Sequence, residues 1–359
     1  MPVTSHKTSM MSGRKSRWDV LGGLMILLLL LWLSDIALGS VKIPLATVVN
    51  ILLGSATDSV AFQNIIYNIR LPKAITAVLA GAALSVGGLQ MQTLFRNPLA
   101  GPSVLGVTAG ASLGVALVTL TAGQAITIYA VQQLGFNSSW LVALAASVGA
   151  SLVLLIILGV SYRVKDYVVL LIAGIMIGNI TLAVVSLWQY FSHPDQIQSY
   201  LLWTFGSLQG VSHQHLLVLF CVTSFGMLLT FLAGKPLNAL LLGEDYALSL
   251  GVRIQRLRVL VIVSTSLLAG VVTAFCGPIG FVGIAVPHLS RGLFRTADHH
   301  VLIPASALLG AIILLACDII AQLPGSATTL PLNAITALIG SPVVIYVILK
   351  NRKQDRSFH

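Results

Sequence analysis

Ten apolar runs, separated by short polar segments, occupy almost the whole chain and most constrain what it can fold into. They lie at about 20–38, 70–94, 103–121, 140–160, 168–190, 214–232, 259–275, 279–289, 301–319 and 333–349. A membrane-spanning helix needs about 20 mostly apolar residues. Only 8% of the 359 residues are charged, against about 25% in soluble domains. The sequence therefore predicts an all-α, polytopic membrane protein with about ten transmembrane helices and no separate soluble domain.

The positions of Lys and Arg predict the orientation of these helices. With ten spans, Lys42, Arg70 and Lys73 fall on one side, and the other 17 of the 20 basic residues fall on the side of both termini. Basic residues concentrate in cytoplasmic loops. We therefore expect a cytoplasmic N-terminal segment at 1–19, a transmembrane domain at 20–349 and a cytoplasmic tail at 350–359. Because the charge follows this pattern, the net charge of +10 does not indicate a nucleic-acid partner.

No constellation for catalysis or cofactor binding is visible. The chain has no Gly-rich phosphate-binding loop that ends in Gly-Lys-Ser/Thr, no nucleophile–base pair and no cluster of metal ligands. Cys221, Cys276 and Cys317 are far apart, and each lies in apolar sequence. The sequence therefore predicts no catalytic residue, no bound metal and no cofactor in this chain.

The loop at 235–258, between two apolar runs, differs from the other connections. Its centre, 241–252, reads Leu-Leu-Gly-Glu-Asp-Tyr-Ala-Leu-Ser-Leu-Gly-Val, which is too short and too polar to span a membrane. It is also too apolar for a plain linker. We expect one or two short amphipathic helices on the cytoplasmic face that another protein grips. The alternative is an interfacial helix that lies flat on lipid.

Two Gly- and Pro-rich stretches interrupt the predicted helices, at 96–102 and 277–283. Proline cannot continue a helix, and freed backbone groups at membrane depth need protein or water as partners. Similar residues, 70–81 and 256–270, precede the two breaks but run in opposite directions across the membrane. This pattern favours two inverted halves around a transport pathway. Close helix packing through Gly is the alternative for the breaks, and chance similarity is the alternative for the repeat.

The source of energy for such transport can be inferred from the acidic residues. Asp35, Asp166 and Asp318 all fall near span ends, and no charge lies in the middle of a predicted span. Ion-coupled carriers usually keep an ionisable residue at depth. The sequence therefore favours energy supplied from outside the membrane over a self-contained ion-coupled secondary transporter. It also disfavours a non-transporting scaffold or sensor, which would leave the paired breaks unexplained.

The order of these motifs resembles the permease family of binding-protein-dependent ATP-binding-cassette (ABC) importers for iron-siderophores, haem and cobalamin. The resemblance covers about residues 65–350. The residues that carry it are Arg70-Leu71-Pro72-Lys73, Gly81-Ala82-Ala83-Leu84, Gln90, Arg96-Asn97-Pro98-Leu99-Ala100, Pro102, Leu105-Gly106, Gly110-Ala111, Gly206-Ser207, Leu242-Gly243, Ala247, Leu250-Gly251-Val252, 277–288, Arg291, Asp318, Leu330-Pro331, 336–340 and Pro342.

The resemblance implies a permease that pairs with a copy of itself in a bacterial inner membrane, with the pathway at the dimer interface. Two cytoplasmic ATPases, which bind the ATP and Mg²⁺, would dock on the coupling residues Leu242, Gly243, Glu244, Asp245, Tyr246, Ala247, Leu250 and Gly251. An extracytoplasmic binding protein would dock near Arg70, Lys73 and Gln322, although Arg70 and Lys73 could instead anchor the helix at lipid headgroups. Gate and pathway residues would be Asn97, Pro98, Leu99, Tyr167, Val168, Gly277, Pro278 and Gly280.

The chain departs from the family pattern at three places. Gln322 stands where the family usually has Arg, which removes one expected docking charge per subunit. The family's Glu-Leu-Pro-Val-Gly becomes Thr-Leu-Pro-Leu-Asn at 329–333, so Asn333 replaces a glycine. The acidic residue usual at the position of Gly101 is absent. We therefore expect docking of the binding protein to depend more on Arg70 and Lys73.

Overall fold

The computed structural model describes residues 5–54, 59–120, 138–164, 166–322 and 328–355, and all regular structure in these ranges is helical. The predicted all-α fold is confirmed. A π-helical turn at Ile66–Arg70 leads into α4, and a 3₁₀ turn at Pro102–Leu105 precedes α5. The helices are α1 Ser5–Ala37, α2 Leu45–Leu52, α3 Val60–Ile65, α4 Leu71–Leu94, α5 Val107–Thr119, α7 Ser138–Arg163, α8 Tyr167–Tyr190, α9 Pro194–Thr204, α10 His213–Leu241, α11 Glu244–Ser249, α12 Ile254–Cys276, α13 Val282–Phe294, α14 His299–Ala321 and α15 Leu332–Asp355.

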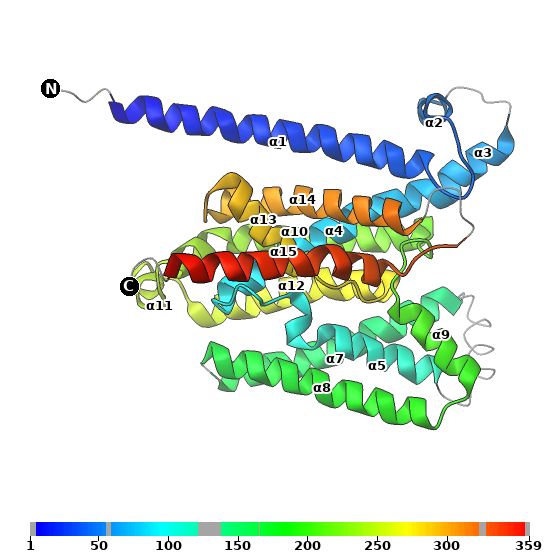
Figure 1. Ribbon diagram of the computed structural model, residues 1–359. Coiled ribbons are helices and arrows are strands. Elements are labelled where there is room, and N and C mark those ends of the chain that lie inside the picture. The colour runs from blue at the N-terminus through cyan, green and yellow to red at the C-terminus, as the bar shows by residue number, and fades with distance from the viewer. Residues whose placement is uncertain (1–4, 55–58, 121–137, 165, 323–327, 356–359) are drawn as a thin grey trace.

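The long helices form one bundle with two distinct ends. The helix α1 begins, and α15 ends, at the end of the bundle where α11 lies, whereas α2, α3 and α9 lie at the opposite end (Figure 1). The segments containing α4 and α12 are the most enclosed, with 78% and 72% of their most apolar windows buried, against 28% for α8 and α10. Helices α4 and α12 therefore form the centre, and α8 and α10 present apolar faces outward.

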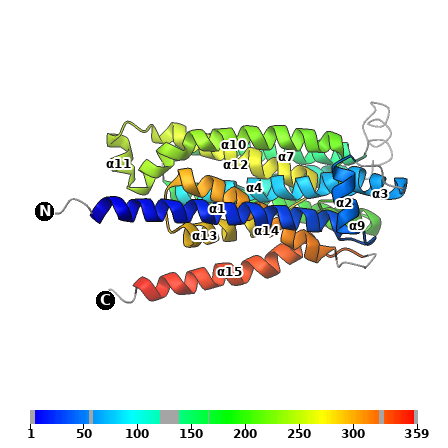
Figure 2. The ribbon, with the colours of Figure 1, turned by 90° about the horizontal axis from the view of Figure 1, so that it is seen from above.

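Seven helices in the described ranges are long and apolar enough to cross a membrane. They correspond to seven of the ten predicted spans, and the other three predicted spans form the shorter apolar helix α5, the half-length helix α13, and α15. Figure 2 shows α15 slanting away from the rest of the bundle toward its C-terminal end. The predicted segments 1–19 and 350–359 lie partly outside the described residues.

Two helices differ from the sequence prediction. The helix α9 lies between the predicted spans 168–190 and 214–232, where no helix was predicted. Pro194 stands at its start, and the side chains of His193 and Gln196 cap its first turn. The helix α13 begins at Val282 and ends at Phe294, later than the predicted span 279–289 at both ends. Phe281 has a positive φ of 64°, which no right-handed helix contains, so the helix cannot begin earlier.

Small residues bring the central helices into close contact. A Cβ atom on Gly81 would lie 2.2 Å from the carbonyl oxygen of Gly310, and one on Gly88 would lie 1.6 Å from that of Gly283. Larger residues cannot occupy these positions without moving a backbone. Close approach through Gly is a usual way for membrane helices to pack, and here it joins α4 to α14 and to the start of α13.

Candidate functional site

The helix α11 is a short, exposed helix between two long ones, as the sequence predicts. Gly243 lies directly before α11 and Gly251 lies just after it, and both have a positive φ, of 120° and 80°. Glycine suits these two turns because it has no Cβ atom to oppose a positive φ. Ala247 is buried against the bundle, whereas Tyr246 and the leucines around it are half or more exposed. The helix therefore presents apolar side chains at the end of the bundle. The coupling residues Leu242, Asp245, Leu250 and Gly251 are exposed as well, and Glu244 is partly buried.

Tyr167 connects this helix to the base of α8. The Tyr167 hydroxyl lies 3.5 Å from Oε1 of Glu244, and the Arg258 guanidinium lies over the Tyr167 ring at 4.5 Å from its centre. Thus Tyr167, a predicted gate residue, contacts both the predicted coupling residue Glu244 and the buried Arg258.

Arg258 fixes this junction to α7. Its side chain is only 2% exposed, and its Nη1 donates a hydrogen bond of 2.6 Å to the carbonyl oxygen of Val164. Gln255, one turn earlier on α12, donates to the carbonyl oxygen of Ser161 at 3.0 Å. From the sequence, Arg258 was expected only as one of the basic residues of the cytoplasmic side. Its burial and its partners were missed, because nothing in the local sequence distinguishes it from the exposed Arg256.

The break after α4 is an ordered loop tied to α13. Asn97 accepts a hydrogen bond at Oδ1 from the backbone N–H of Leu99, at 2.9 Å, which closes an Asx turn. The Pro98 carbonyl oxygen lies 2.7 Å from Nε2 of His288. Since a carbonyl oxygen can only accept, Nε2 of His288 carries the proton. Pro98 and Leu99 are exposed, and so is Val168 at the start of α8.

A second set of hydrogen bonds joins the end of α4 to α13. Gln92 donates to the carbonyl oxygen of Ile284 at 3.1 Å, and its Oε1 accepts from Nη1 of Arg291 at 2.5 Å. Nearby, Thr93 contacts Nε2 of His299 at 2.9 Å, and Nδ1 of His299 contacts Asn238 at 2.7 Å. Side-chain contacts therefore connect the first break, α13 and the end of α10 that leads into α11.

The second break, at 277–281, has partners for its freed backbone groups. Asn333 accepts a hydrogen bond from the backbone N–H of Gly280 at 3.0 Å, and the N–H of Ser207 donates to the carbonyl oxygen of Cys276 at 2.8 Å. A Cβ atom on Gly277 would lie 2.5 Å from the carbonyl oxygen of Trp203. Close packing, the alternative explanation from the sequence, therefore accounts for the glycine at 277. Pro278 and Gly280 are partly buried in the same segment.

At the opposite end of the bundle, a buried ionic cluster joins three helices. Nζ of Lys73 on α4 lies 2.8 Å from Asp318 on α14 and 3.2 Å from Asp35 on α1. Gln322 donates to Asp35 at 2.8 Å and to Asp318 at 2.9 Å. Because one ammonium group and one amide bridge two carboxylates, this outer cluster holds α1, α4 and α14 together.

Arg70 lies beside the cluster and binds backbone rather than carboxylate. Its guanidinium donates to the carbonyl oxygens of Ile36, Ala37 and Val41, which lie at and beyond the end of α1. Arg70, Lys73 and Gln322 are all buried, although the sequence placed the two basic residues at an outer surface. Their direct contact with a binding protein stays a prediction, and in the structure their polar atoms bond to partners within the chain.

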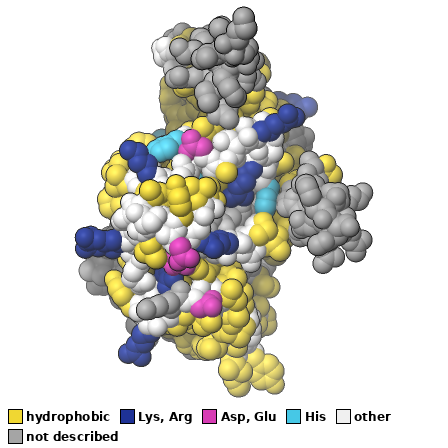
Figure 3. Space-filling view, turned by 90° about the vertical axis from the view of Figure 1, so that its left-hand side faces the viewer, with side chains coloured by type: hydrophobic (Ala, Val, Ile, Leu, Met, Phe, Trp, Pro, Cys, Tyr) yellow, Lys and Arg dark blue, Asp and Glu magenta, His cyan; other side chains and the backbone are white. Residues whose placement is uncertain are grey.

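The end of the bundle around α11 is rich in basic residues. Figure 3 looks onto this end and shows Lys and Arg spread over it, with acidic and hydrophobic side chains between them. Among the side chains that the structure describes, the exposed basic residues at this end are Arg96, Arg163, Lys235, Arg253, Arg256 and Arg295. Among the described residues, no three His, Cys, Asp or Glu side chains gather closely enough to hold a metal ion.

Comparisons with known proteins identify the family. The chain matches the FecCD transport family over residues 26–350. It is 36% identical over 339 residues to the vitamin B12 import system permease protein BtuC of Klebsiella pneumoniae subsp. pneumoniae, across 94% of this chain and 95% of that protein. The BtuC of Salmonella typhimurium is 36% identical over 289 residues, across 80% of this chain and 84% of its own length.

A solved structure has the same fold. It is described as an inward-facing conformation of a metal-chelate type ABC transporter, and it superposes with a TM-score of 0.79 at 30% sequence identity. The superposition covers 92% of this chain and 99% of that one. With the family match across most of the chain and the seven membrane-length helices, the resemblance seen in the sequence is confirmed: the chain is a multi-pass membrane protein that belongs to the FecCD transport family.

Proposed function

We propose that this chain is the permease subunit of an ABC importer in a bacterial inner membrane. It takes a corrinoid, an iron-siderophore or haem from an extracytoplasmic binding protein and passes it to the cytoplasm. The single observation that supports this most is α11, a short helix with exposed apolar side chains at the basic end of the bundle. A surface of this kind suits a protein partner, and relatives named as import permeases span nearly the same length.

In this proposal the chain forms a homodimer with ten spans per subunit, two inverted halves and both termini in the cytoplasm. The pathway lies between the subunits, where the exposed apolar faces of α8 and α15 are available for contact. Two cytoplasmic ATPases bind ATP and Mg²⁺ and dock on 242–251. Their energy, rather than an ion gradient, drives the transport.

The contacts of Tyr167 suggest how a movement of the ATPase-binding helix α11 reaches the inner gate. Movement of α11 reaches Tyr167 through Glu244, and Arg258 holds Tyr167 against α7 and α12. Val168 and the loop at Asn97–Leu99 would then open or close the inner gate. A membrane-embedded gate of this kind needs an element with two arrangements that the ATPase biases.

The outer cluster suggests a role at the binding-protein end. Lys73, Asp318 and Gln322 hold the ends of α4 and α14 together. They would therefore fix the relative positions of these helix ends, where the binding protein docks. Direct docking would then depend on neighbouring exposed residues such as Gln209 and Thr329, which line an outer hollow of about 200 Å³ together with Gln322.

The test is reconstitution with the chain's own partners. The tagged chain is solubilised from its native membranes, the co-purifying ATPase and binding protein are identified, and all are placed in proteoliposomes. We expect ATP-dependent uptake of one of cobalamin, a ferric siderophore or haem. Uptake that persists without the ATPase and collapses with the ion gradient would instead indicate the secondary transporter.

A further inference from the structure

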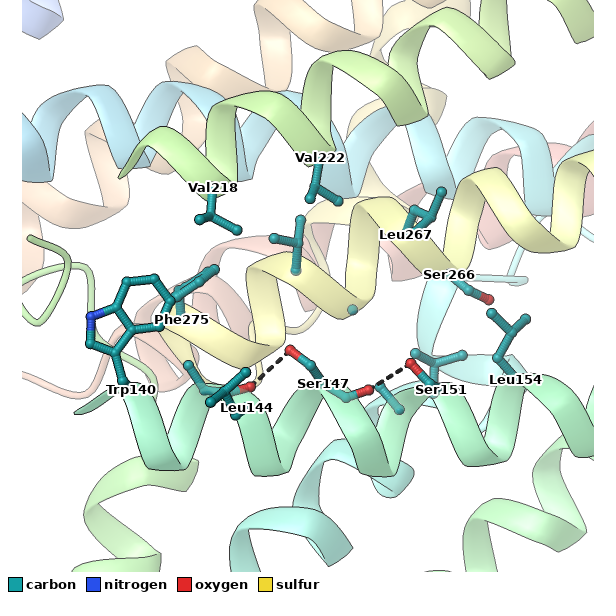
Figure 4. Close-up of a pocket in the computed structure, with 15 residues that line it drawn as sticks. Trp140, Leu144, Ser147, Ser151, Leu154, Val218, Val222, Ser266, Leu267 and Phe275 are labelled. Atoms are coloured by element: carbon teal, nitrogen blue, oxygen red, sulfur yellow. Dashed lines mark hydrogen bonds between the residues drawn. The ribbon is translucent and has the colours of Figure 1, made fainter. Parts of the chain in front are cut away.

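A cavity of about 250 Å³ lies in the apolar part of the bundle, away from α11. Its lining includes Phe275, two residues before the second break, and Val107 at the start of α5. It lies between α7 and α10 and is backed by α12 (Figure 4). Trp140 and Phe275 stand at one end, and Leu154 stands at the other (Figure 4). None of the coupling, docking or gate residues lines it.

The cavity opens toward the membrane. Leu144 on α7 and Val218 on α10 line it and are 46% and 37% exposed. Other apolar residues on the outward faces of these two helices, such as Val148 and Leu217, are exposed as well. In a membrane-spanning chain such faces contact hydrocarbon, so the mouth of the cavity is continuous with the lipid-facing surface.

The polar groups in the lining are nearly all engaged. The Ser147 hydroxyl donates to the carbonyl oxygen of Ala143 at 2.8 Å, and the Ser151 hydroxyl donates to that of Ser147 at 2.7 Å (Figure 4). The Ser266 hydroxyl on α12 is buried and has no hydrogen-bond partner in the part of the chain that the structure describes. A buried water needs two to four polar partners, so this lining does not favour water.

An empty cavity is equally unfavourable, because its lining atoms would lose their dispersion contacts on one side. An apolar cavity of about 150 Å³ already binds benzene, so one of 250 Å³ accommodates a longer hydrocarbon. We propose that an acyl chain of a bilayer phospholipid enters between α7 and α10 and occupies this cavity. The aromatic rings of Trp140 and Phe275, which stand 6.1 Å apart edge to face, close one end against it.

A photoactivatable lipid tests this proposal. The intact chain is placed in nanodiscs of phosphatidylethanolamine that carries a diazirine near the middle of one acyl chain, and it is irradiated. The carbene that forms inserts into nearby O–H and C–H bonds, and peptide mass spectrometry locates the adducts. We expect adducts on Ser266 and Val271, which are 5% and 8% exposed, as well as on the outward Val148. Adducts on Val148 without any on α12 would overturn the proposal.

Filling the cavity gives the matched variants. A Cβ atom on Gly270 would make only ordinary contacts, at 3.8 Å to Val107 and 3.9 Å to Ala150, so Gly270→Leu directs a side chain into the space. We expect a fivefold or greater loss of Ser266 adducts and unchanged Val148 adducts. Ala143→Leu fills the same space from α7 and serves if Gly270→Leu does not fold. Unchanged Ser266 labelling in a folded filling variant would overturn the proposal.

Discussion

The guanidinium of Arg258 lies 4.5 Å from the centre of the Tyr167 ring, and this contact joins α12 to the first residue of α8. A desolvated cation–π contact is worth about 2 kcal/mol, and a hydrogen bond from a charged donor such as that to Val164 is worth about 1.5–3 kcal/mol. These two interactions hold Tyr167 against the start of α12, and we propose that they let a displacement of α11 reach α8.

We predict that Arg258→Met lowers uptake per ATP hydrolysed about tenfold, because Tyr167 loses its support while α11 stays available to the ATPase. Arg256→Met is the matched control, since Arg256 is exposed on the same helix. Uptake and ATP hydrolysis are measured in the same proteoliposomes. Equal coupling ratios in the two variants would exclude a transmitting role for Arg258.

Reversing the charge at the start of α11 tests the coupling residues. We expect Glu244→Lys with Asp245→Lys to abolish most uptake while the protein stays folded in the membrane, because both residues lie in the first turn of the exposed helix. Uptake, ATPase co-purification and membrane abundance are measured together. Normal uptake with normal abundance would count against this assignment.

The outer cluster predicts a large loss of stability on removal of its cation. Lys73→Met leaves two buried carboxylates without compensation, and breaking a buried pair in this way costs about 3–5 kcal/mol. The matched rescue replaces Asp35 and Asp318 with Asn in the same chain. Thermal unfolding in detergent should show the triple variant recovering most of the loss, and a triple variant as unstable as the single one would contradict the electrostatic explanation.

We expect Asn333 to stabilise the backbone of the second break. Asn333→Ala leaves the backbone N–H of Gly280 without its acceptor, which costs about 1–3 kcal/mol when the group is buried. Asn68→Ala is the control, because Asn68 is exposed and a surface change of this kind stays within about 0.5 kcal/mol. The two free energies of unfolding are compared, and equal values would show that Asn333 does not support the break.

We expect Asp298, at the start of α14, to give the stability of the fold a weak dependence on pH. Burial alone would raise the pKa of Asp298, but hydrogen bonds from the His300 backbone N–H and the Asn238 amide together lower it below its ordinary 3.8. A depressed carboxyl pKa stabilises the fold above the unfolded-state pKa, and this contribution is lost as the pH falls through the folded-state pKa. The Tm difference between wild type and Asp298→Asn should therefore shrink from pH 6 to pH 3. A constant difference would contradict it.

The positions of the long helices could be predicted because each apolar run must satisfy its own backbone in lipid. Both helix breaks could be predicted as well, because Pro and Gly occur together in each. Proline alone would not have been enough, since Pro236 and Pro304 lie inside helices. The helix α9 was missed because its apolar residues are too few to indicate a span, although Pro194 after His193 was a usable start signal.

The outer cluster and the Arg258 junction could not be predicted. Asp35 and Gln322 are 287 residues apart, and Arg258 and Val164 are 94 residues apart, so only packing brings them together. Whether a charged side chain is exposed or buried could not be predicted either. A basic residue near a span end reads alike whether it is exposed, as Arg256 is, or enclosed, as Lys73 is. Burial depends on which helix packs against the residue, and the neighbouring residues in the sequence do not indicate which helix that is.

The outer cluster also has a consequence for how the chain is made. Asp35 is synthesised 38 residues before Lys73 and 287 residues before Gln322, so the first helix enters the membrane with a carboxyl group that has no partner yet. Lys73 can pair with Asp35 once α4 has been inserted, but the cluster is complete only when α14 has followed with Asp318 and Gln322. We therefore expect ribosome-released fragments that end before Asp318 to be degraded faster than the full chain, which would make the cluster a checkpoint on complete synthesis.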